Sequence, residues 1–324
     1  MKNKIRKYIK KYNLIPQNTK IILGLSGGPD SVFLLDLLSE LQTEGLIQEV
    51  IAAHLDHEWR IESPLDEQFC AKIAKKYNTP FTSSRISDLG LELKFEGSKE
   101  EMGRKARRYF FEQVRKKYNA DTIALAHHAQ DQQETFFIRL IRGASLSGLT
   151  AMKPKHGHYI RPLLETNKQD LVNYLDTHKI PYLTDPSNIS QEFLRNRIRK
   201  QVIPALQKCD ARFDQNFQTT IHRLQKTEFF LENLTKQTFN EISTESQGVF
   251  YVNLKLLLNL DPIILYRILI HWLITQNVKF PISEGFLDEI IKFLKQPGSK
   301  KHQLHPNWIL ARKKGIAHIK TDLL

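Results

Sequence analysis

The sequence has little cysteine and no long apolar run, and both absences exclude classes of protein. The two cysteines, Cys70 and Cys209, lie far apart and outside any CxxC pair. This excludes a disulfide framework, a zinc site built on cysteine and a cysteine-held iron–sulfur cluster. The longest apolar stretch, residues 263–274, is interrupted by Arg267 and His271 and falls short of the roughly 20 residues that span a membrane. We therefore expect a soluble protein of the reducing cytoplasm.

Acidic residues are also outnumbered. Asp and Glu total 35 against 48 Lys and Arg, which gives a net charge of +13 and a pI of about 9.5. This balance favours a polyanionic partner such as nucleic acid, although a general compositional bias has the same effect. A chain of 324 residues is long enough for two domains, which we place at 1–210 and 211–324.

One short stretch combines the residue types that bind phosphate. Residues 21–25 form an apolar run typical of a strand, residues 26–31 (SGGPDS) are small and polar, and helical apolar spacing begins at Val32. A strand, a glycine loop and a helix start present backbone N–H groups to an anion, and Asp30 adds a carboxylate that suits phosphate-bound Mg²⁺. The stretch is neither a Walker A loop nor GxGxxG. An ordinary turn is the alternative, because Gly, Pro, Asp and Ser all favour turns.

Strand-like and helix-like segments alternate over the first two hundred residues. Strands are expected at 21–25, 49–55, 81–86 and 121–126, with helices between them. This order predicts an α/β fold with a parallel, doubly wound sheet that binds ligands beyond the carboxyl ends of its strands. Three polar motifs follow strands and should meet at that edge, namely residues 26–31, 54–60 and 127–134.

Two of these motifs have more than one interpretation. His54 and His57 have an HxxH spacing, but a strand end does not keep both imidazoles on one face and no third ligand is evident. The spacing therefore gives little support to zinc. Asp131 and Glu134 are three residues apart at a predicted helix start, so one helix face presents both carboxylates to Mg²⁺ or to an ammonium group. Stabilisation of the helix dipole is the simpler interpretation of acids in a first turn.

Residues 99–118 form a strongly basic predicted helix. Arginines and aromatic residues are interleaved along GRKARRYFF, residues 103–111. Cations beside aromatic rings are typical of an RNA-binding surface. A solvated helix whose phenylalanines face the core explains the pattern equally well.

Seven motifs together carry a family resemblance. SGGPDS alone resembles the pyrophosphate loop of the N-type ATP pyrophosphatases. The whole set resembles the tRNA(Ile)-lysidine synthetase family and covers about the first two-thirds of the chain. The motifs are SGGPDS, HLDHEWR (54–60), GRKARRYFF (103–111), LAHHAQDQQETFFIRLIRGASLSGLTAM (125–152), RPLL (161–164), DPSN (185–188) and LRNRIR (194–199). Two departures are visible: Gln130 stands where the family usually has an acid, and Arg107-Arg108 precede Tyr109 where the family usually has RY.

The resemblance implies a PP-loop ATPase fold (adenine nucleotide alpha-hydrolase-like) that uses ATP and Mg²⁺. It also implies ligation of L-lysine to the wobble cytidine of the CAU anticodon of tRNA(Ile). ATP adenylates the carbonyl oxygen of the base and releases pyrophosphate. The ε-amine of lysine then attacks the same ring carbon and expels AMP. The product, lysidine, switches charging from Met to Ile and decoding from AUG to AUA.

The resemblance assigns roles to residues as well. Asp30 would bind Mg²⁺, Asp131 and Glu134 would bind the lysine ammonium groups or complete the metal site, and one carboxylate or His127 would act as the base. ATP contacts are expected from Ser26, Gly27, Gly28, Pro29, Asp30, Ser31, His54 and Arg104. Contacts to the tRNA backbone or to ATP phosphates are expected from Arg104, Arg107, Arg195, Arg197 and Arg199.

From about residue 211 the alternation stops. Helices are expected at 213–241, from Asp261 and from Ser283, followed by a small C-terminal β-hairpin around residues 312–315. This mainly helical domain resembles the family's first C-terminal domain, in a short form without the last one. We expect it to grip the acceptor arm or elbow of the tRNA, and mere support of the catalytic domain is the alternative. A homodimer and a lid at residues 92–101 are further hypotheses.

Two other functions compete with lysine ligation. Another PP-loop tRNA-modifying enzyme, of the cytidine thiolase type, shares the loop but is expected to carry paired cysteine motifs. A non-catalytic RNA-binding protein on a nucleotide-binding scaffold would explain the basic charge. The retained set of Asp30, Asp131 and Glu134 argues against this third function.

Overall fold

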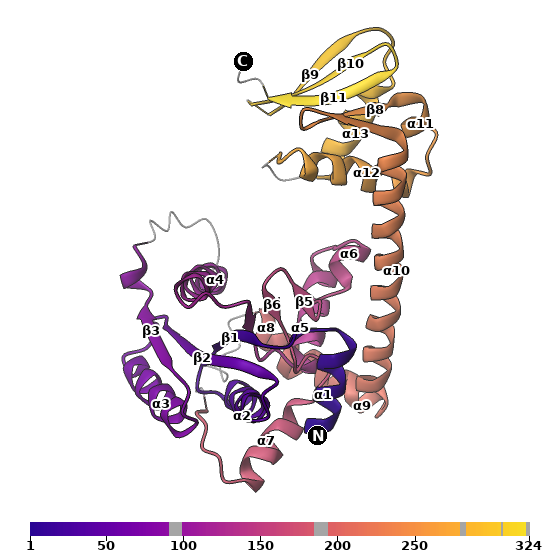
Figure 1. Ribbon diagram of the computed structural model, residues 1–324. Helices are drawn as coiled ribbons and strands as arrows, with labels where there is room; N and C mark the ends of the chain where they lie inside the picture. Colours follow the sequence, from indigo (N-terminus) through magenta and orange to yellow (C-terminus); the bar gives the residue numbers. More distant parts are fainter. Residues whose placement is uncertain (91–98, 185–193, 279–282, 306, 322–324) are drawn as a thin grey trace. The chain divides into compact units, whose positions relative to one another are not determined.

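The structure, a computed structural model, describes residues 1–90, 99–184, 194–278, 283–305 and 307–321 (Figure 1). Two compact units make up the chain, Met1–His222 and Arg223–Leu324. The boundary expected at residue 210 precedes helix α10 (Phe213–Ile242), whereas the two units divide within this helix.

A six-stranded sheet organises the first unit. Its order is β3-β2-β1-β4-β6-β5, and all neighbours are parallel except β5 and β6. The expected parallel α/β sheet is thereby confirmed. The strands are β1 (Thr19–Gly24), β2 (Ile47–Asp56), β3 (Phe81–Arg85), β4 (Thr122–Ala124), β5 (Lys155–His156) and β6 (Tyr159–Ile160).

Helices cover both faces of this sheet, with α2 and α3 on one side and α4 on the other (Figure 1). The helices that connect or flank the strands are α1 (Lys2–Lys11), α2 (Pro29–Thr43), α3 (Ser63–Lys76), α4 (Lys99–Lys117), α5 (Ala129–Ile141), α6 (Leu146–Leu149), α7 (Lys168–Thr177), α8 (Leu194–Arg197) and α9 (Ile203–Cys209). A short 3₁₀ helix (Ser87–Leu89) follows β3, and a π-helical turn (Ile198–Val202) joins α8 to α9.

Strand periodicity explains why the sheet needs both layers. Ile21 and Leu23 of β1 lie in the core beneath α2, whereas Ile22 lies in the core beneath α4. Successive side chains of a strand point to opposite faces, so a strand buried on both sides is apolar throughout. Phe110 and Phe111 of α4 belong to the second core. These two rings therefore face the core, as the alternative interpretation of the basic helix had it.

The second unit packs helices on one face of a five-stranded sheet. The sheet order is β7-β8-β11-β10-β9, with antiparallel pairing throughout. Its elements are β7 (Ser243–Ser246), β8 (Val249–Asn253), α11 (Leu254–Leu258), α12 (Pro262–Thr275), α13 (Glu284–Leu294), β9 (Lys300–His305), β10 (Trp308–Lys313) and β11 (Ile316–Thr321).

The predicted helix starts and hairpin of this unit are confirmed. The side chain of Asp261 accepts a hydrogen bond from Ile263 N at the start of α12, and Ser283 accepts one from Phe286 N at the start of α13. The hairpin pairs β10 with β11. The sequence-based account was incomplete here, because β7, β8 and β9 extend the hairpin into a full sheet. In the described parts of the chain no helix combines the length and apolarity needed to cross a membrane.

Candidate active site

The glycine loop lies between β1 and α2. Gly27 has φ +81, and a Cβ built on it would lie 2.7 Å from Cδ1 of Leu183. Gly28 caps α2 with φ −68, a conformation open to any residue, and Pro29 occupies the first helical position. The backbone N–H groups of both glycines donate to no residue that the structure describes. The loop therefore offers an anion two backbone donors at a helix N-terminus.

Two serines fix the shape of the loop. The Ser26 backbone N–H and hydroxyl both donate to Oγ of Ser31, each at 3.2 Å. The Ser31 hydroxyl donates in turn to the carbonyl of Gly28 at 2.9 Å. Ser31 is buried and Ser26 is exposed. Ser31 thus acts inside the loop, while Ser26 is the hydroxyl that lies at the surface.

Asp30 projects from the first turn of α2 and is incompletely paired. Its Oδ2 atom lies 3.6 Å from Nε2 of His128 and 3.8 Å from Nζ of Lys168. Its Oδ1 atom is buried and accepts no hydrogen bond from the described residues. Burial raises the pKa of this carboxyl, although the nearby His128 and Lys168 oppose the increase. A buried oxygen without a donor is the kind of ligand that a cation would satisfy.

His128 and Asp131 form the start of α5. His128 is the N-cap, and its backbone N–H donates to Oδ2 of Asp131 at 2.9 Å. Burial of Asp131 would raise its pKa, but His128, His127 and Arg195 together lower it to about 2. Asp131 is therefore ionised at neutral pH and is held in place by the cap.

Glu134 is fully buried and is clamped by two arginines. Arg195 Nε donates to its Oε2 atom at 2.6 Å, and Arg199 Nε donates to Oε1 at 2.5 Å. Arg195 also reaches Oδ1 of Asp131 at 3.1 Å. The sequence had suggested that Arg195 and Arg199 contact RNA or ATP phosphates, whereas here both guanidinium groups neutralise the acidic pair. Each remains about one-third exposed, at 29% and 32%.

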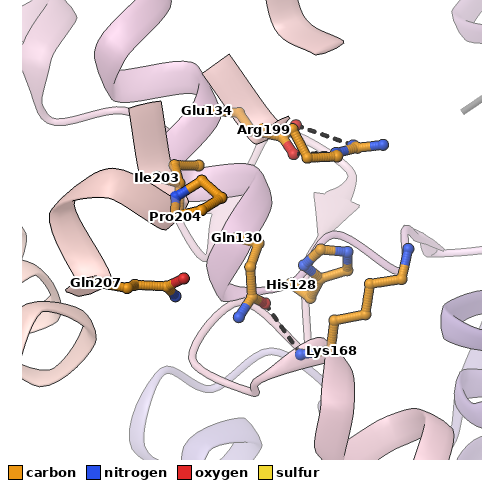
Figure 2. Close-up of a pocket in the computed structure, with 8 residues that line it drawn as sticks. All are labelled: His128, Gln130, Glu134, Lys168, Arg199, Ile203, Pro204 and Gln207. Carbon is orange, nitrogen blue, oxygen red and sulfur yellow. Dashed lines mark hydrogen bonds and ion pairs between the residues drawn. The ribbon is translucent and has the colours of Figure 1, made fainter. Parts of the chain in front are cut away.

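A pocket of about 170 Å³ adjoins these groups. Figure 2 shows its lining, with Glu134 and Arg199 paired on one side and Lys168 extended beside His128. The Gln130 side-chain carbonyl accepts a hydrogen bond from the Lys168 backbone N–H at 3.0 Å. The complete lining is His128, Gln130, Glu134, Lys168, Arg199, Ile203, Pro204 and Gln207.

The histidines at the other strand ends have different environments. His54, at the end of β2, is buried, and its Nδ1 lies 2.9 Å from the carbonyl of Leu25. His57 stacks on Trp59, with ring centroids 4.7 Å apart, and burial together with Arg107 lowers its pKa to about 4. Among the described residues no group of three or more His, Cys, Asp and Glu could hold a metal ion. His54 thus contacts the carbonyl of Leu25, and His57 packs against Trp59.

His127 follows β4 and is neutral. Burial lowers its pKa to about 3, and Arg161, Arg195 and Arg107 act in the same direction against Asp131. Its Nδ1 atom is buried without a hydrogen-bond partner in the described structure. A neutral imidazole with an unpaired nitrogen suits hydrogen bonding to a ligand better than it suits proton abstraction.

Exposed arginines of α4 lie beside two arginines from other elements. Arg104 makes no hydrogen bond or ion pair with the described residues. Burial is the main cause that lowers the pKa of Arg139 and Arg161, and the charge of Arg104 is the second cause. Arg108 lies 5.2 Å above the ring of Tyr159. The Arg161 Nε–H group is buried and unpaired within the described structure. Mutually repelling guanidinium groups with an unsatisfied donor indicate an anion site.

Comparisons with known proteins support this assignment of the fold and family. A PP-loop domain model matches residues 1–206. A tRNA(Ile)-lysidine synthase from Bacillus subtilis is 32% identical over 98% of this chain and 67% of its own length. The chain belongs to the tRNA(Ile)-lysidine synthase family. Synthases from Persephonella marina (29% identity, 98% of this chain, 69% of its own length) and Bacillus cereus (30%, 90% and 63%) are similar to it as well. The chain thus spans about two-thirds of the length of these synthases.

A solved structure supports the fold independently. A U34-tRNA thiolase from Methanococcus maripaludis, solved with its 4Fe–4S cluster, superimposes with a TM-score of 0.57 at 20% identity. The match covers 69% of this chain and 76% of the thiolase. This likeness establishes the PP-loop fold for the synthase chain.

Sequence reasoning missed Lys168 at this site. Lys168 is the first residue of α7, directly after the N-cap Asn167. A cation at a helix N-terminus opposes the helix dipole, so its position was an available indication of another role. The DPSN motif (185–188) and residues 92–98 of the proposed lid lie outside the described residues. Leu183, two residues before DPSN, donates its backbone N–H to the carbonyl of Gly27 at 2.9 Å.

Proposed function

We propose that this chain ligates L-lysine to the wobble cytidine of a tRNA(Ile) with a CAU anticodon, at the expense of ATP. The carbonyl oxygen of the cytosine attacks the α-phosphate of ATP and pyrophosphate leaves. The ε-amine of lysine then attacks the adjacent ring carbon, and AMP departs with the oxygen. The observation that carries the proposal is the buried Oδ1 atom of Asp30, which accepts no hydrogen bond from the described residues, beside an open glycine loop in a synthase-family chain.

The loop would bind the leaving pyrophosphate. The free N–H groups of Gly27 and Gly28 provide donors that are ordered before the ligand arrives, and the exposed Ser26 hydroxyl would turn from Oγ of Ser31 to the ligand. Pro29 and Ser31 act on loop shape. We assign His54 the same kind of role toward ATP, because its imidazole fixes the strand end at Leu25.

Asp30 fits a magnesium ion that phosphates share. Mg²⁺ usually takes one or two protein carboxylates and completes its shell with phosphate oxygens and water. A buried oxygen without a donor among the described residues agrees with that pattern. The ion would neutralise charge on the departing pyrophosphate.

The pocket would receive lysine. Asp131 follows the pocket-lining Gln130 on α5, stays ionised at neutral pH and is the carboxylate best suited to an ammonium group. Lys168 and Arg199 line the same pocket and suit the lysine carboxylate. Glu134 supports the pocket through its two arginines, and His127 positions a ligand through Nδ1.

The RNA would be held by the basic surface of α4. Arg104 lies in the cluster with Arg139 and Arg161, and Arg107 lies one helical turn further along. We propose that both contact phosphates near the anticodon, and that Arg197, which is exposed on α8, does the same. The second unit would bind a more distant part of the tRNA. A homodimer and a cytoplasmic location remain predictions.

The test supplies ATP, Mg²⁺, labelled lysine and unmodified tRNA(Ile), and measures label retained on the RNA. Incorporation that requires ATP and is absent with tRNA(Met) is the expected result. Release of pyrophosphate that depends on tRNA, without lysine incorporation, would contradict lysine as the nucleophile. RNA binding without consumption of ATP would contradict the enzyme and favour the binding protein.

A further inference from the structure

The five-stranded sheet of the second unit has one packed face and one open face. Val252 and Ala317 lie in the core with α12 and α13, which cover one side of the sheet (Figure 1). Because successive residues of a strand point to opposite faces, Tyr251 and His318 point to the other side. Tyr251 is 37% exposed, which agrees with this direction.

Tyr251 and His318 form an aromatic pair on the open face. They are directly opposite in the register of β8 and β11, and their ring centroids are 5.1 Å apart at an interplanar angle of 39°. Burial lowers the pKa of His318, and the charge of Lys320 lowers it further. The imidazole is therefore neutral at physiological pH. Two uncharged rings therefore lie side by side at the surface.

Lysines surround this aromatic pair without acidic neighbours. Lys301, Lys313 and Lys320 are exposed and point to the same face, and none forms an ion pair with the described residues. The register places Lys301 in the same cross-strand row as Tyr251 and His318. No Asp or Glu occurs at the open-face positions of the described strands, which are Thr244, Ser246, Val249, Tyr251, Asn253, Lys301, Gln303, Ile309, Ala311, Lys313, Ile316, His318 and Lys320.

We propose that this open face binds RNA, with an unpaired base stacked on Tyr251 and His318 and the flanking phosphates held by Lys301, Lys313 and Lys320. The inference rests on the proposed function for the identity of the RNA, and it specifies which surface of the second unit makes the contact. An aromatic platform beside cations is how proteins recognise single-stranded RNA, because rings stack on bases and lysines neutralise phosphates. A surface with three unpaired cations and no carboxylate complements a polyanion.

Cross-strand stabilisation is the competing explanation for the aromatic pair. Opposite aromatic residues stabilise a sheet whether or not a ligand binds. Tyr251→Ala removes the ring and Tyr251→Phe keeps it, and RNA affinity measured beside thermal stability separates the two roles, because a folded Tyr251→Ala variant that binds RNA as the parent does has lost only a cross-strand contact. The pair Lys301→Gln and Lys320→Gln tests the phosphate contacts without touching the core, and Lys292→Gln on α13 is the matched control.

The experiment uses the full chain and measures the Kd for the complete tRNA by fluorescence anisotropy at several salt concentrations. We expect Tyr251→Ala to weaken binding about tenfold and Tyr251→Phe to stay within about twofold of the parent. The double lysine variant should reduce the slope of log K against log salt by about 1 to 2, with no change for Lys292→Gln. Thermal unfolding confirms that each variant is folded.

The outcomes separate this inference from the proposed function. If Tyr251→Ala and the double lysine variant both bind RNA as tightly as the parent, the open face is not an RNA surface, even where lysine ligation is intact. If the parent binds RNA and these variants do not, the surface stands even where no lysine is incorporated. If Tyr251→Ala unfolds, the double lysine variant alone decides.

Discussion

Replacing Asp30 by asparagine should slow the reaction about 10²- to 10³-fold and leave the fold intact. Oδ1 of Asp30 has no donor in the described structure, and Nε2 of His128 and Nζ of Lys168 lie 3.6 and 3.8 Å from Oδ2. Burial raises the pKa of this carboxyl. A carboxyl whose pKa is higher in the folded than in the unfolded protein destabilises the fold once the pH exceeds both values. Asp30→Asn should therefore raise the free energy of unfolding at pH 7 by about 0.5–2 kcal/mol.

The same substitution removes the proposed magnesium ligand. Loss of one preorganised electrostatic group typically lowers kcat about 10²- to 10³-fold, or about 3–4 kcal/mol of transition-state stabilisation. The assay is pyrophosphate release that depends on tRNA, measured beside urea unfolding of the same preparation. Normal turnover by Asp30→Asn would refute the metal assignment. If Asp30→Asn is inactive and also unfolds at a lower urea concentration than the parent, then Asp30 stabilises the fold. This result would refute the claim that Asp30 serves the reaction at the expense of stability.

Asp36 on the same helix provides a matched control. It pairs with Lys2 at 2.7 Å and accepts hydrogen bonds from Tyr77 at 2.9 Å and Tyr174 at 3.1 Å. Asp36→Asn should lower the free energy of unfolding by about 1–3 kcal/mol, because it weakens charged hydrogen bonds. It should leave turnover unchanged where the protein is folded. The two aspartates of α2 should thus respond in opposite ways to the same chemical change.

Three further predictions follow from the loop and the acidic pair. Glu134→Gln should lower the free energy of unfolding by about 2–4 kcal/mol, because it leaves two guanidinium groups without their buried counter-charge; thermal and urea unfolding measure this. Gly27→Ala should cost about 1–3 kcal/mol and weaken ATP binding, because φ is +81 and Leu183 occupies the space of a Cβ; nucleotide titration measures this. Asp131 has a folded pKa of about 2 against an ordinary value of 3.8, so it stabilises the fold by about 2 kcal/mol above pH 4, and this contribution is lost as the pH falls from about 4 to 2. Asp131→Asn should flatten the acid limb of the stability curve.

For each of these three variants, one experimental result would contradict the prediction. An unchanged melting temperature for Glu134→Gln would mean that Arg195 and Arg199 find other counter-charges. For Gly27 the control is Gly28→Ala, because φ is −68 there and a Cβ would make only an ordinary contact with Oγ of Ser26 at 3.7 Å, so this variant should fold normally and lose ATP affinity alone. Equal loss of stability in both glycine variants would contradict the distinction. A parallel acid limb for Asp131→Asn and the parent would show that other carboxyls control acid unfolding.

The apolar periodicity of neighbouring residues was sufficient to predict the fold class. It was not sufficient to predict features that depend on contacts between distant segments. The strand, loop and helix at residues 21–43 follow from changes in apolar spacing that neighbouring residues define. The placement of Phe110 and Phe111 required the sheet, because a helix with aromatic residues beside arginines has the same pattern on a core or on RNA. Strand β7 was missed because its four residues (STES) are all polar and become a strand through pairing with β8, whereas the β-branched and aromatic residues of β8 (VFYVN) were a strand signal that the sequence-based account did not use.

The acidic residues illustrate the same limit at the site. Asp131 and Glu134 were correctly expected to share a helix face, but the side chains that form ion pairs with them are arginines more than sixty residues away. The sequence likewise grouped Gly27 with Gly28. Their φ values separate a glycine that the fold requires from one that only a ligand approaching the loop would require.

The charges around the pocket explain why one carboxylate is left for a ligand. Glu134 is matched by Arg195 and Arg199, and Arg195 also reaches Asp131. Among the described residues, Asp30 faces His128 and the ammonium of Lys168, both at distances beyond a hydrogen bond. A cation bound to Asp30 would repel Lys168 and release its ammonium toward an anionic group in the same pocket. The residue that binds magnesium in our proposal therefore also controls the cation that would hold the carboxylate of lysine, so ATP–Mg²⁺ and lysine should bind with positive coupling through Lys168.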